Sequence, residues 1–161
     1  MSITIRPAVP ANGDWITALL DEWGGPVTWA DGRAFDCLAL PALTAGERDG
    51  LAIYEVAGER AELVLLETLR LGSGIGTALL EALVDLLTWQ AVRELWLTST
   101  NDNLDALRFY QRRGFPLVEV RVDAMAEARR HKPTIPEIGE YGIPMYDELR
   151  LVRVLHPRLD A

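Results

Sequence analysis

The sequence predicts an α/β fold, in which a mixed, mostly antiparallel central sheet carries helices on both faces. Two observations predict this class. The first half of the chain holds apolar segments separated by short turns, which is typical of an antiparallel meander. The second half alternates strand patterns with helical patterns, which indicates strands joined through covering helices. Because the chain has 161 residues, 49% of them hydrophobic, we expect a single domain over residues 1–161.

The first three elements are predicted from periodicity and turn residues. Residues 3–6 alternate apolar and polar side chains and stop at Pro7, so we expect a short edge strand. Asn12 precedes residues 13–23, whose apolar side chains recur at helical spacing, and we expect a helix capped by Asn12. Residues 27–36 carry turn residues and two large aromatic side chains without a period. This segment is therefore predicted to be irregular and to wall a pocket.

The rest of the chain is predicted as a meander followed by alternating helices and strands. The meander strands cover residues 38–44, 51–56 and 63–69, joined by hairpin turns at 46–50 and 57–60. After them we expect helices over about residues 74–90, 103–111 and 123–130, and strands over 93–98, 115–121 and 148–155. Ligands of open α/β sheets bind at the carboxyl ends of strands, where the third meander strand meets a glycine-rich segment.

Composition excludes several classes of partner. The formal net charge of -8 disfavours binding to a nucleic acid backbone. No apolar run is long enough to span a membrane, and the N-terminus lacks the pattern of an export signal. The single cysteine excludes an internal disulfide, and no cysteine or histidine cluster has metal-ligand spacing. We therefore expect a cytoplasmic protein that binds no nucleic acid, membrane or metal.

Three glycines, Gly72, Gly74 and Gly76, stand between the last meander strand and a strongly apolar helix. Glycines let main-chain N–H groups approach an anion closely, and a new helix adds unpaired N–H donors and the positive end of its dipole. The segment therefore predicts a phosphate-binding cradle. An adenosine dinucleotide motif fits less well because no βαβ unit starts here, and a nucleotide P-loop fails because no Gly-Lys-Ser/Thr follows.

Residues 71–80, LGSGIGTALL, and residues 103–115, NLDALRFYQRRGF, together resemble the GNAT superfamily of acetyl-CoA-dependent N-acetyltransferases. The first looks like its (Gln/Arg)-x-x-Gly-x-(Gly/Ala) diphosphate loop, and the second like its Asn-x-x-Ala-x-x-(Phe/Leu)-Tyr-x-x-x-Gly-Phe segment. The resemblance implies an acyl-CoA N-acyltransferase fold with acetyl-CoA as cosubstrate. The cofactor contacts it implies are Leu66, Thr68, Leu71, Gly72, Ser73, Gly74, Ile75, Gly76, Thr77, Asn103 and Tyr110.

Two positions depart from the family pattern. Leu71 stands where the family has Gln or Arg, with Arg70 one residue earlier, so one side-chain contact to the cofactor is missing. Thr68 stands where the family has a proline at the end of the preceding strand. Main-chain donors survive both changes, which therefore bear on cofactor affinity more than on cofactor identity. Leu71 also motivates the alternative function, a catalytically silent acyl-CoA-binding module.

The predicted reaction needs a carboxylate to take the amine proton, because an alkylamine with a pKa near ~10.4 is protonated at neutral pH. Glu62 and Glu67 are the candidates, and on a regular strand they point to opposite faces, since five positions separate them. Residues 61–64 resemble the base-carrying strand of some family members, which favours Glu62. The resemblance implies that Tyr110 hydrogen-bonds or protonates the leaving thiolate. Asn103 caps the helix that follows it, contacts the pantetheine arm, or does both.

The acceptor is expected to be a small-molecule amine that attacks acetyl-CoA directly in a ternary complex. Tyr141, Tyr146, Asp147 and Glu148 lie on or after a proline-rich loop, and such a loop often forms a lid. Aromatic side chains beside carboxylates suit a cationic amine, and a solvated loop packed by its tyrosines is the alternative. Homodimers are frequent in families like this one, so a homodimer is a further expectation.

Overall fold

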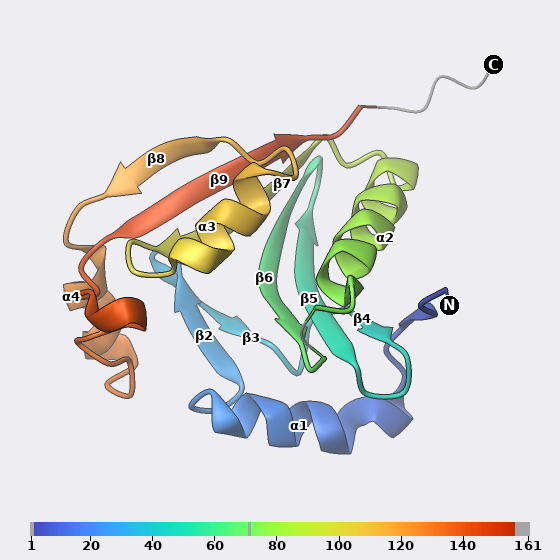
Figure 1. The fold of residues 1–161 in the computed structure, drawn as a ribbon, viewed down its shortest axis with the longest axis horizontal. Coiled ribbons are helices and arrows are strands. Elements are labelled where there is room, and N and C mark those ends of the chain that lie inside the picture. Colours follow the sequence, from blue (N-terminus) through green and yellow to red (C-terminus); the bar gives the residue numbers. More distant parts are fainter. Residues whose placement is uncertain (1, 71, 157–161) are drawn as a thin grey trace.

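A computed structural model describes residues 2–70 and 72–156, which form one seven-stranded sheet and a separate two-stranded hairpin (Figure 1). The strands are β1 (Ile5–Pro7), β2 (Val27–Ala30), β3 (Arg33–Asp36), β4 (Ala42–Ala45), β5 (Gly50–Ala57), β6 (Arg60–Thr68), β7 (Glu94–Thr100), β8 (Leu117–Arg121) and β9 (Glu148–Val154). The helices are α1 (Gly13–Glu22), α2 (Ile75–Trp89), α3 (Leu104–Gln111) and α4 (Ala124–His131), with 3-10 turns at Pro10–Asn12 and Glu140–Gly142.

The sheet has the order β1-β4-β5-β6-β7-β9-β8. Of its neighbouring pairs, β6 and β7 run parallel and the others run antiparallel. The parallel pair arises because α2 carries the chain back to the starting end of the sheet before β7 begins. The predicted class, a mixed and mostly antiparallel sheet, is confirmed.

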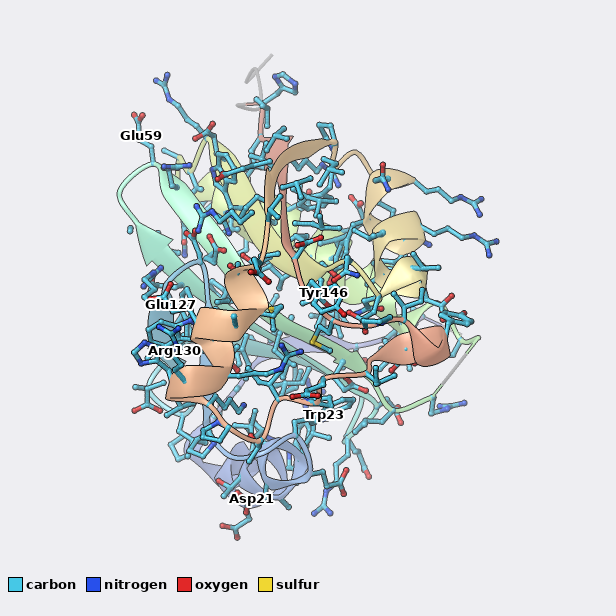
Figure 2. The ribbon with its side chains drawn as sticks, turned by 90° about the vertical axis from the view of Figure 1, so that its left-hand side faces the viewer. Asp21, Trp23, Glu59, Glu127, Arg130 and Tyr146 are labelled. Carbon is cyan, nitrogen blue, oxygen red and sulfur yellow. The ribbon has the colours of Figure 1, made fainter. Side chains whose placement is uncertain are left out.

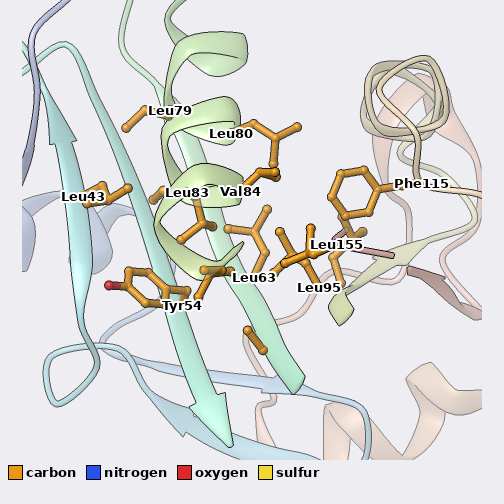
Figure 3. Packing of buried hydrophobic residues seen from close by; sticks show 14 of the residues in the cluster. Leu43, Tyr54, Leu63, Leu79, Leu80, Leu83, Val84, Leu95, Phe115 and Leu155 are labelled. Carbon is orange, nitrogen blue, oxygen red and sulfur yellow. The ribbon is translucent and has the colours of Figure 1, made fainter. Parts of the chain in front are cut away.

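Helices cover both faces of the sheet, as predicted. The apolar stripe of α2 supplies fully buried leucines to a core on one face (Figure 3). Side chains of α3 also pack against this core. The opposite face holds a smaller core around α1, to which Ile16, Leu19 and Leu20 contribute. α1 and α2 therefore each bury one stripe against one face of the sheet, as a helical period near 3.6 requires.

The segment over residues 27–36 was predicted to be irregular, and this prediction is wrong. It forms the β2–β3 hairpin, in which Ala30 lies opposite Arg33. The two turn residues, Asp31 and Gly32, both adopt positive φ, at 53° and 72°. An Asp-Gly pair favours this tight hairpin turn, so the sequence carried the signal. Its position as a pocket wall is nevertheless observed, because Asp31 and Arg33 line a cavity described below.

Two smaller predictions about local structure are also corrected. Asn12 stands at the start of α1, but its side-chain oxygen accepts a hydrogen bond from the N–H of Val9 at 2.8 Å and does not cap α1. The first meander strand is shorter than predicted, since β4 begins only at Ala42.

Among the described residues, no helix has both the length and the apolar character needed to cross a bilayer.

Candidate active site

The glycine segment forms a hollow where β6 ends and α2 begins. A cavity of about 240 Å³ is lined here by Thr68, Arg70, Gly72, Ser73, Gly74, Ile75, Gly76, Thr77, Phe109 and Arg113. The helix closes its first turn with a bond from the N–H of Ala78 to the carbonyl of Gly74 at 3.0 Å. The N–H groups just before Ala78 lie in the first turn of α2, where donors lack helical partners. The hollow therefore has the donors and the dipole end of an anion site.

The three glycines serve two different purposes. Gly72 and Gly74 have φ values of 72° and 77°, a backbone conformation that other residues rarely adopt, and a Cβ at either would meet no atom within 4 Å. Gly76 is instead needed for close packing, since its Cβ would lie 3.2 Å from Thr68 and 3.4 Å from the Phe109 ring. Two glycines thus shape an open cradle, and the third lets α2 approach β6 and α3.

The predicted cofactor contacts in the loop have distinct surroundings. The hydroxyl of Ser73 donates to the carbonyl of Arg70 at 2.6 Å, so this hydrogen bond stabilises the loop itself. Ile75 buries its side chain in the core, so only its main chain is available to a ligand. Thr77 lines the cavity. Leu71, the position at which the family pattern is broken, lies outside the described residues.

Arg113 adds a positive charge to the cradle, and this contribution was not predicted from the sequence. Its Nε donates to Thr77 Oγ1 at 3.0 Å, and a second nitrogen donates to the carbonyl of Phe109 at 2.9 Å. Its guanidinium also lies 3.8 Å from the centre of the Phe109 ring. These contacts fix a positive charge beside the first turn of α2, where an anion would gain from it.

The sheet opens beside the cradle. β6 pairs with β7 only from Arg60 to Leu63, opposite Glu94–Leu97, although β6 continues to Thr68 and β7 to Thr100. Past Leu63 the main-chain groups of β6 that point away from β5 therefore have no strand partner. Leu66 and Thr68, both predicted cofactor contacts, lie on this stretch. The opening leads from the cradle toward the middle of the sheet.

A β-bulge lies where the two strands separate, and it corrects the prediction for Glu62 and Glu67. The register between β5 and β6 shifts between the pairs Tyr54↔Leu63 and Ile53↔Leu65, so Val64 is the extra residue. One extra residue reverses the alternation of side chains. Glu62 and Glu67 were predicted to lie on opposite faces, and the bulge places both on the face that carries α1.

Tyr110 lies on α3 beside this opening. Its ring packs edge-on against Phe109 and Phe115, with ring centres 5.2 Å and 5.7 Å away. Burial, and secondly the carboxylate of Glu67, raise the pKa of the Tyr110 hydroxyl above its ordinary value. The hydroxyl is therefore a proton-bearing donor at neutral pH. Among the residues that the structure describes, the Tyr110 hydroxyl has no hydrogen-bond partner.

Asn103 begins α3 and caps it. Its side-chain oxygen accepts a hydrogen bond from the N–H of Ala106 at 3.3 Å. The capping role given to Asn103 is thus observed, and its amide nitrogen has no partner within residues 2–70 and 72–156. The cap fixes the start of α3, which in turn sets where Tyr110 lies.

Glu62 is committed to a buried ion pair. Both of its oxygens accept from the guanidinium of Arg150, which also donates to Thr98 at 2.8 Å. Arg150 lies 3.4 Å from Asp31 as well, and Asp31 pairs with Arg121. This chain of charges ties the hairpin turn to β6 and β9. It lies in the wall of a cavity of about 170 Å³ that also includes Arg33 and Trp96.

Glu67 has different surroundings. Its carboxylate has no hydrogen-bond or ion-pair partner among the described residues. Burial, and secondly the carboxylate of Glu22, raise the pKa of Glu67. The negative charge of Glu67 contributes to the raised pKa of Tyr110, after burial. Of the two predicted carboxylates, Glu67 is the one whose oxygens are available to accept a proton.

The proline-rich loop over residues 132–147, named here the strap, bridges two parts of the molecule. At one end Lys132 donates to the carbonyl of Val27 at 2.8 Å, and at the adjoining end of α4 the ring of His131 stacks on Trp29 at 3.8 Å. Figure 2 shows α4 above the end of α1, where Trp23 lies. The strap thus starts against the β2–β3 hairpin.

The other end of the strap is bound to the turn between β7 and α3. Asn101 donates to the carbonyl of Pro144 at 2.9 Å and accepts from the N–H groups of Tyr146 and Asp147. The buried carboxylate of Asp102 accepts from the N–H of Glu140 at 2.8 Å. These partners lie more than 40 positions from Asn101 along the chain, beyond the reach of any local sequence pattern.

The four residues predicted to line the acceptor site do not gather around one cavity. Tyr141 is exposed and donates to Asp105 at 2.7 Å, and Tyr146 is also exposed. Asp147 accepts from the N–H of Asp123. Glu148 is buried, and burial raises its pKa. Only Glu148 therefore faces the charged cluster beneath the hairpin, where Asp31 donates its N–H to Glu148 at 3.4 Å.

The structure thus combines a glycine cradle at a strand end, an open seam in a mixed sheet and a partly buried tyrosine beside that seam, an arrangement typical of a ligand site in an α/β fold. The model of the acetyltransferase (GNAT) family matches residues 50–115. The uncharacterized protein YdhI of Bacillus subtilis is 35% identical over 138 residues, which are 83% of this chain and 86% of that protein. The chain belongs to the acetyltransferase (GNAT) family.

Solved structures show the same fold. IAA acetyltransferase from Bacillus cereus superposes with a TM-score of 0.71 at 21% identity, covering 96% of this chain and 100% of that one. A GNAT family acetyltransferase from Elizabethkingia anophelis with acetyl-CoA bound gives a TM-score of 0.67 at 20% identity, covering 95% and 98%. These similarities are similarities of fold.

Proposed function

We propose that this protein transfers the acetyl group of acetyl-CoA to a primary amine by direct attack in a ternary complex. The observation that carries the proposal is the continuity of the cradle with the open seam between β6 and β7. A cosubstrate with an anionic diphosphate at one end and an extended arm at the other fits this combination. The related fold with acetyl-CoA bound supports the same cosubstrate.

The diphosphate is proposed to bind the first turn of α2, through the main chain of residues 72–77 and the guanidinium of Arg113. Arg113 replaces the charge that position 71 lacks. The pantetheine arm is proposed to lie in the seam, where its amides pair with the free edge of β6 around Leu66 and Thr68, as an added strand would. The amide nitrogen of Asn103 is proposed to contact the arm at the start of α3.

Tyr110 is proposed to act on the leaving group. The amine nitrogen attacks the thioester carbon, the new C–N bond forms and the C–S bond breaks, so that the sulfur departs as a thiolate. The ordinary pKa is about 10 for a phenol and about 8.5 for a thiol. Full transfer of the proton from the phenol to the thiolate is therefore uphill by about 2 kcal/mol. Because the pKa of Tyr110 is raised further, we propose that its hydroxyl keeps its proton and donates a hydrogen bond to the thiolate.

Glu67 is proposed as the group that takes the amine proton, directly or through a water molecule. Glu62 was preferred from the sequence, but protonating it would break its bidentate contact with Arg150. Glu67 has no such contact, and its pKa is already raised toward the working pH. A carboxylate with a raised pKa is a better base for an amine.

The experiment that tests the function combines calorimetric titration of CoA with a thiol-release assay over a panel of primary amines. The proposal predicts both binding and release of free CoA that depends on the amine. Binding without release on any amine of the panel would support the silent acyl-CoA-binding module instead. Absence of binding would contradict both functions.

A further inference from the structure

The two edges of the sheet differ sharply in their protection. β1 forms one edge, has three residues and ends at Pro7, which has no N–H to offer. β8 forms the other edge with five residues, Leu117–Arg121, and contains neither proline nor lysine. Proteins usually protect a strand edge with such residues because it presents unpaired N–H and C=O groups. The edge at β8 has neither of these residues, and its protection is confined to the irregularity at Val118 and the charged side chains of Glu119 and Arg121.

Three of the five side chains of β8 are apolar and exposed. The exposed fractions are 41% for Leu117, 50% for Val118 and 51% for Val120, and Val122 just beyond the strand is 80% exposed. Figure 1 shows β8 at the outer rim of the sheet with no element beyond it. Water thus contacts both the apolar side chains and the free main-chain edge, a combination that favours a strand partner.

We propose that the free edge of β8 is an interface at which two copies of this chain pair antiparallel about Val120. The sequence of the strand is complementary to itself in this register. Val120 lies opposite Val120 of the second copy, Glu119 opposite Arg121, and Arg121 opposite Glu119. Opposite charges and β-branched side chains facing each other stabilise a strand pair.

The fold places the charges correctly for this pairing. Glu119 is paired in register with Arg150 and Arg121 with Glu148, so both side chains lie on one face of the sheet. The side chains of Glu119 and Arg121 are 47% and 36% exposed, and they already contact each other at 2.9 Å. Two copies would therefore form a group of four alternating charges on that face. Val120 lies on the opposite face, where the apolar contact forms.

The first test measures association by sedimentation equilibrium and light scattering over a concentration series. The wild-type chain is expected to form a dimer. Val120→Lys places two like charges opposite each other and should raise the dimer dissociation constant by at least about tenfold. Val154→Lys is the matched control, because Val154 is a strand valine of similar exposure, 56%, at the far end of β9, and it should leave association unchanged.

A monomeric wild-type chain at all concentrations, or a Val120→Lys dimer as tight as the wild type, would overturn the proposal. Circular dichroism and CoA titration show whether each variant is folded. Neither substitution touches the cradle or Tyr110, so this test is independent of the proposed reaction.

The second test examines the register. Cys37 is the single cysteine and is buried, so a Cys37→Ser background allows one new thiol to be followed. Val120→Cys should give a covalent dimer with a short bis-maleimide linker, because the two thiols lie opposite each other. Val154→Cys should give none. Equal linking of both variants would contradict pairing about Val120.

Discussion

At the scale of single residues, Tyr110 is the most specific element of the proposed reaction. Tyr110→Phe removes one hydroxyl and keeps the ring that packs between Phe109 and Phe115. Because the hydroxyl acts only on the departing thiolate, we expect kcat to fall by about 100-fold with little change in the KM for acetyl-CoA. Steady-state kinetics measure both. Tyr54→Phe, which removes the hydroxyl of a buried tyrosine in the same core, should leave kcat unchanged, and equal losses in the two variants would refute the role.

Glu67 and Glu62 are separated by the pH dependence of the reaction. The active form of the base is the carboxylate, and the pKa of Glu67 is raised. The acid limb of kcat/KM should therefore lie at higher pH than that of an ordinary glutamate, which is about 4.3. Glu67→Gln should lower the rate and remove this limb. If Glu62→Gln removes the limb and Glu67→Gln keeps it, the assignment is reversed.

Arg113 is expected to contribute affinity for the cofactor rather than catalysis. Arg113→Gln removes the charge beside the first turn of α2, and loss of one charge-assisted contact should raise the Kd for CoA by about 10-fold. Arg112→Gln is the matched control, since Arg112 is the exposed neighbour and does not line the cradle. Calorimetric titration measures both. An equal change in the two variants would show that only the overall charge matters.

These residues also show what a sequence can and cannot supply. The glycines and Tyr110 stand in local patterns, so their places in the site were predictable. Arg112 and Arg113 look alike in the sequence, and only the turn at the end of α3 directs one of them toward Thr77. The partner of Glu62 is 88 positions away along the chain, and no local pattern indicates such a pairing.

At the scale of elements, the approach of α2 to β5 controls the shape of the cradle. A Cβ at Gly50 would lie 2.7 Å from Ile75 and 2.8 Å from Leu79. Gly50→Ala should therefore push the start of α2 outward, lowering the free energy of unfolding by about 1–3 kcal/mol and weakening CoA binding. Urea denaturation and calorimetric titration measure these effects. Gly13→Ala meets no atom within 4 Å, so it should be neutral or stabilising, and a stable, tight-binding Gly50→Ala variant would refute the account.

Most elements were predicted because their periods are clear, and there are physical reasons why a hairpin, despite its Asp-Gly turn, and a bulge were missed. The hairpin of β2 and β3 lacks alternation, since its strands bury few side chains and only Phe35 is fully covered. The bulge at Val64 follows from how β6 pairs with β5. An extra residue in one strand leaves no trace in the apolar pattern of that strand alone, so the faces of Glu62 and Glu67 could not be assigned correctly.

At the scale of the whole molecule, the buried charges around Arg150 join β6, β9 and the hairpin. Arg150→Met would leave the carboxylate of Glu62 buried without a partner, and we expect a loss of about 3 kcal/mol in the free energy of unfolding. Adding Glu62→Leu removes the unpaired charge and should recover most of that loss, because Asp31 still forms its ion pair with Arg121. Urea denaturation of the three variants measures this cycle. Additive losses in the double variant would contradict the role of the pair.

The central claim is that residues 72–77 and Arg113 bind the diphosphate of coenzyme A. A crystal structure of the protein with CoA tests it most directly. The account predicts the diphosphate at the first turn of α2, within hydrogen-bond distance of its main-chain N–H groups, and the pantetheine arm between β6 and β7. A bound CoA whose diphosphate lies elsewhere, with the cradle empty, would contradict it.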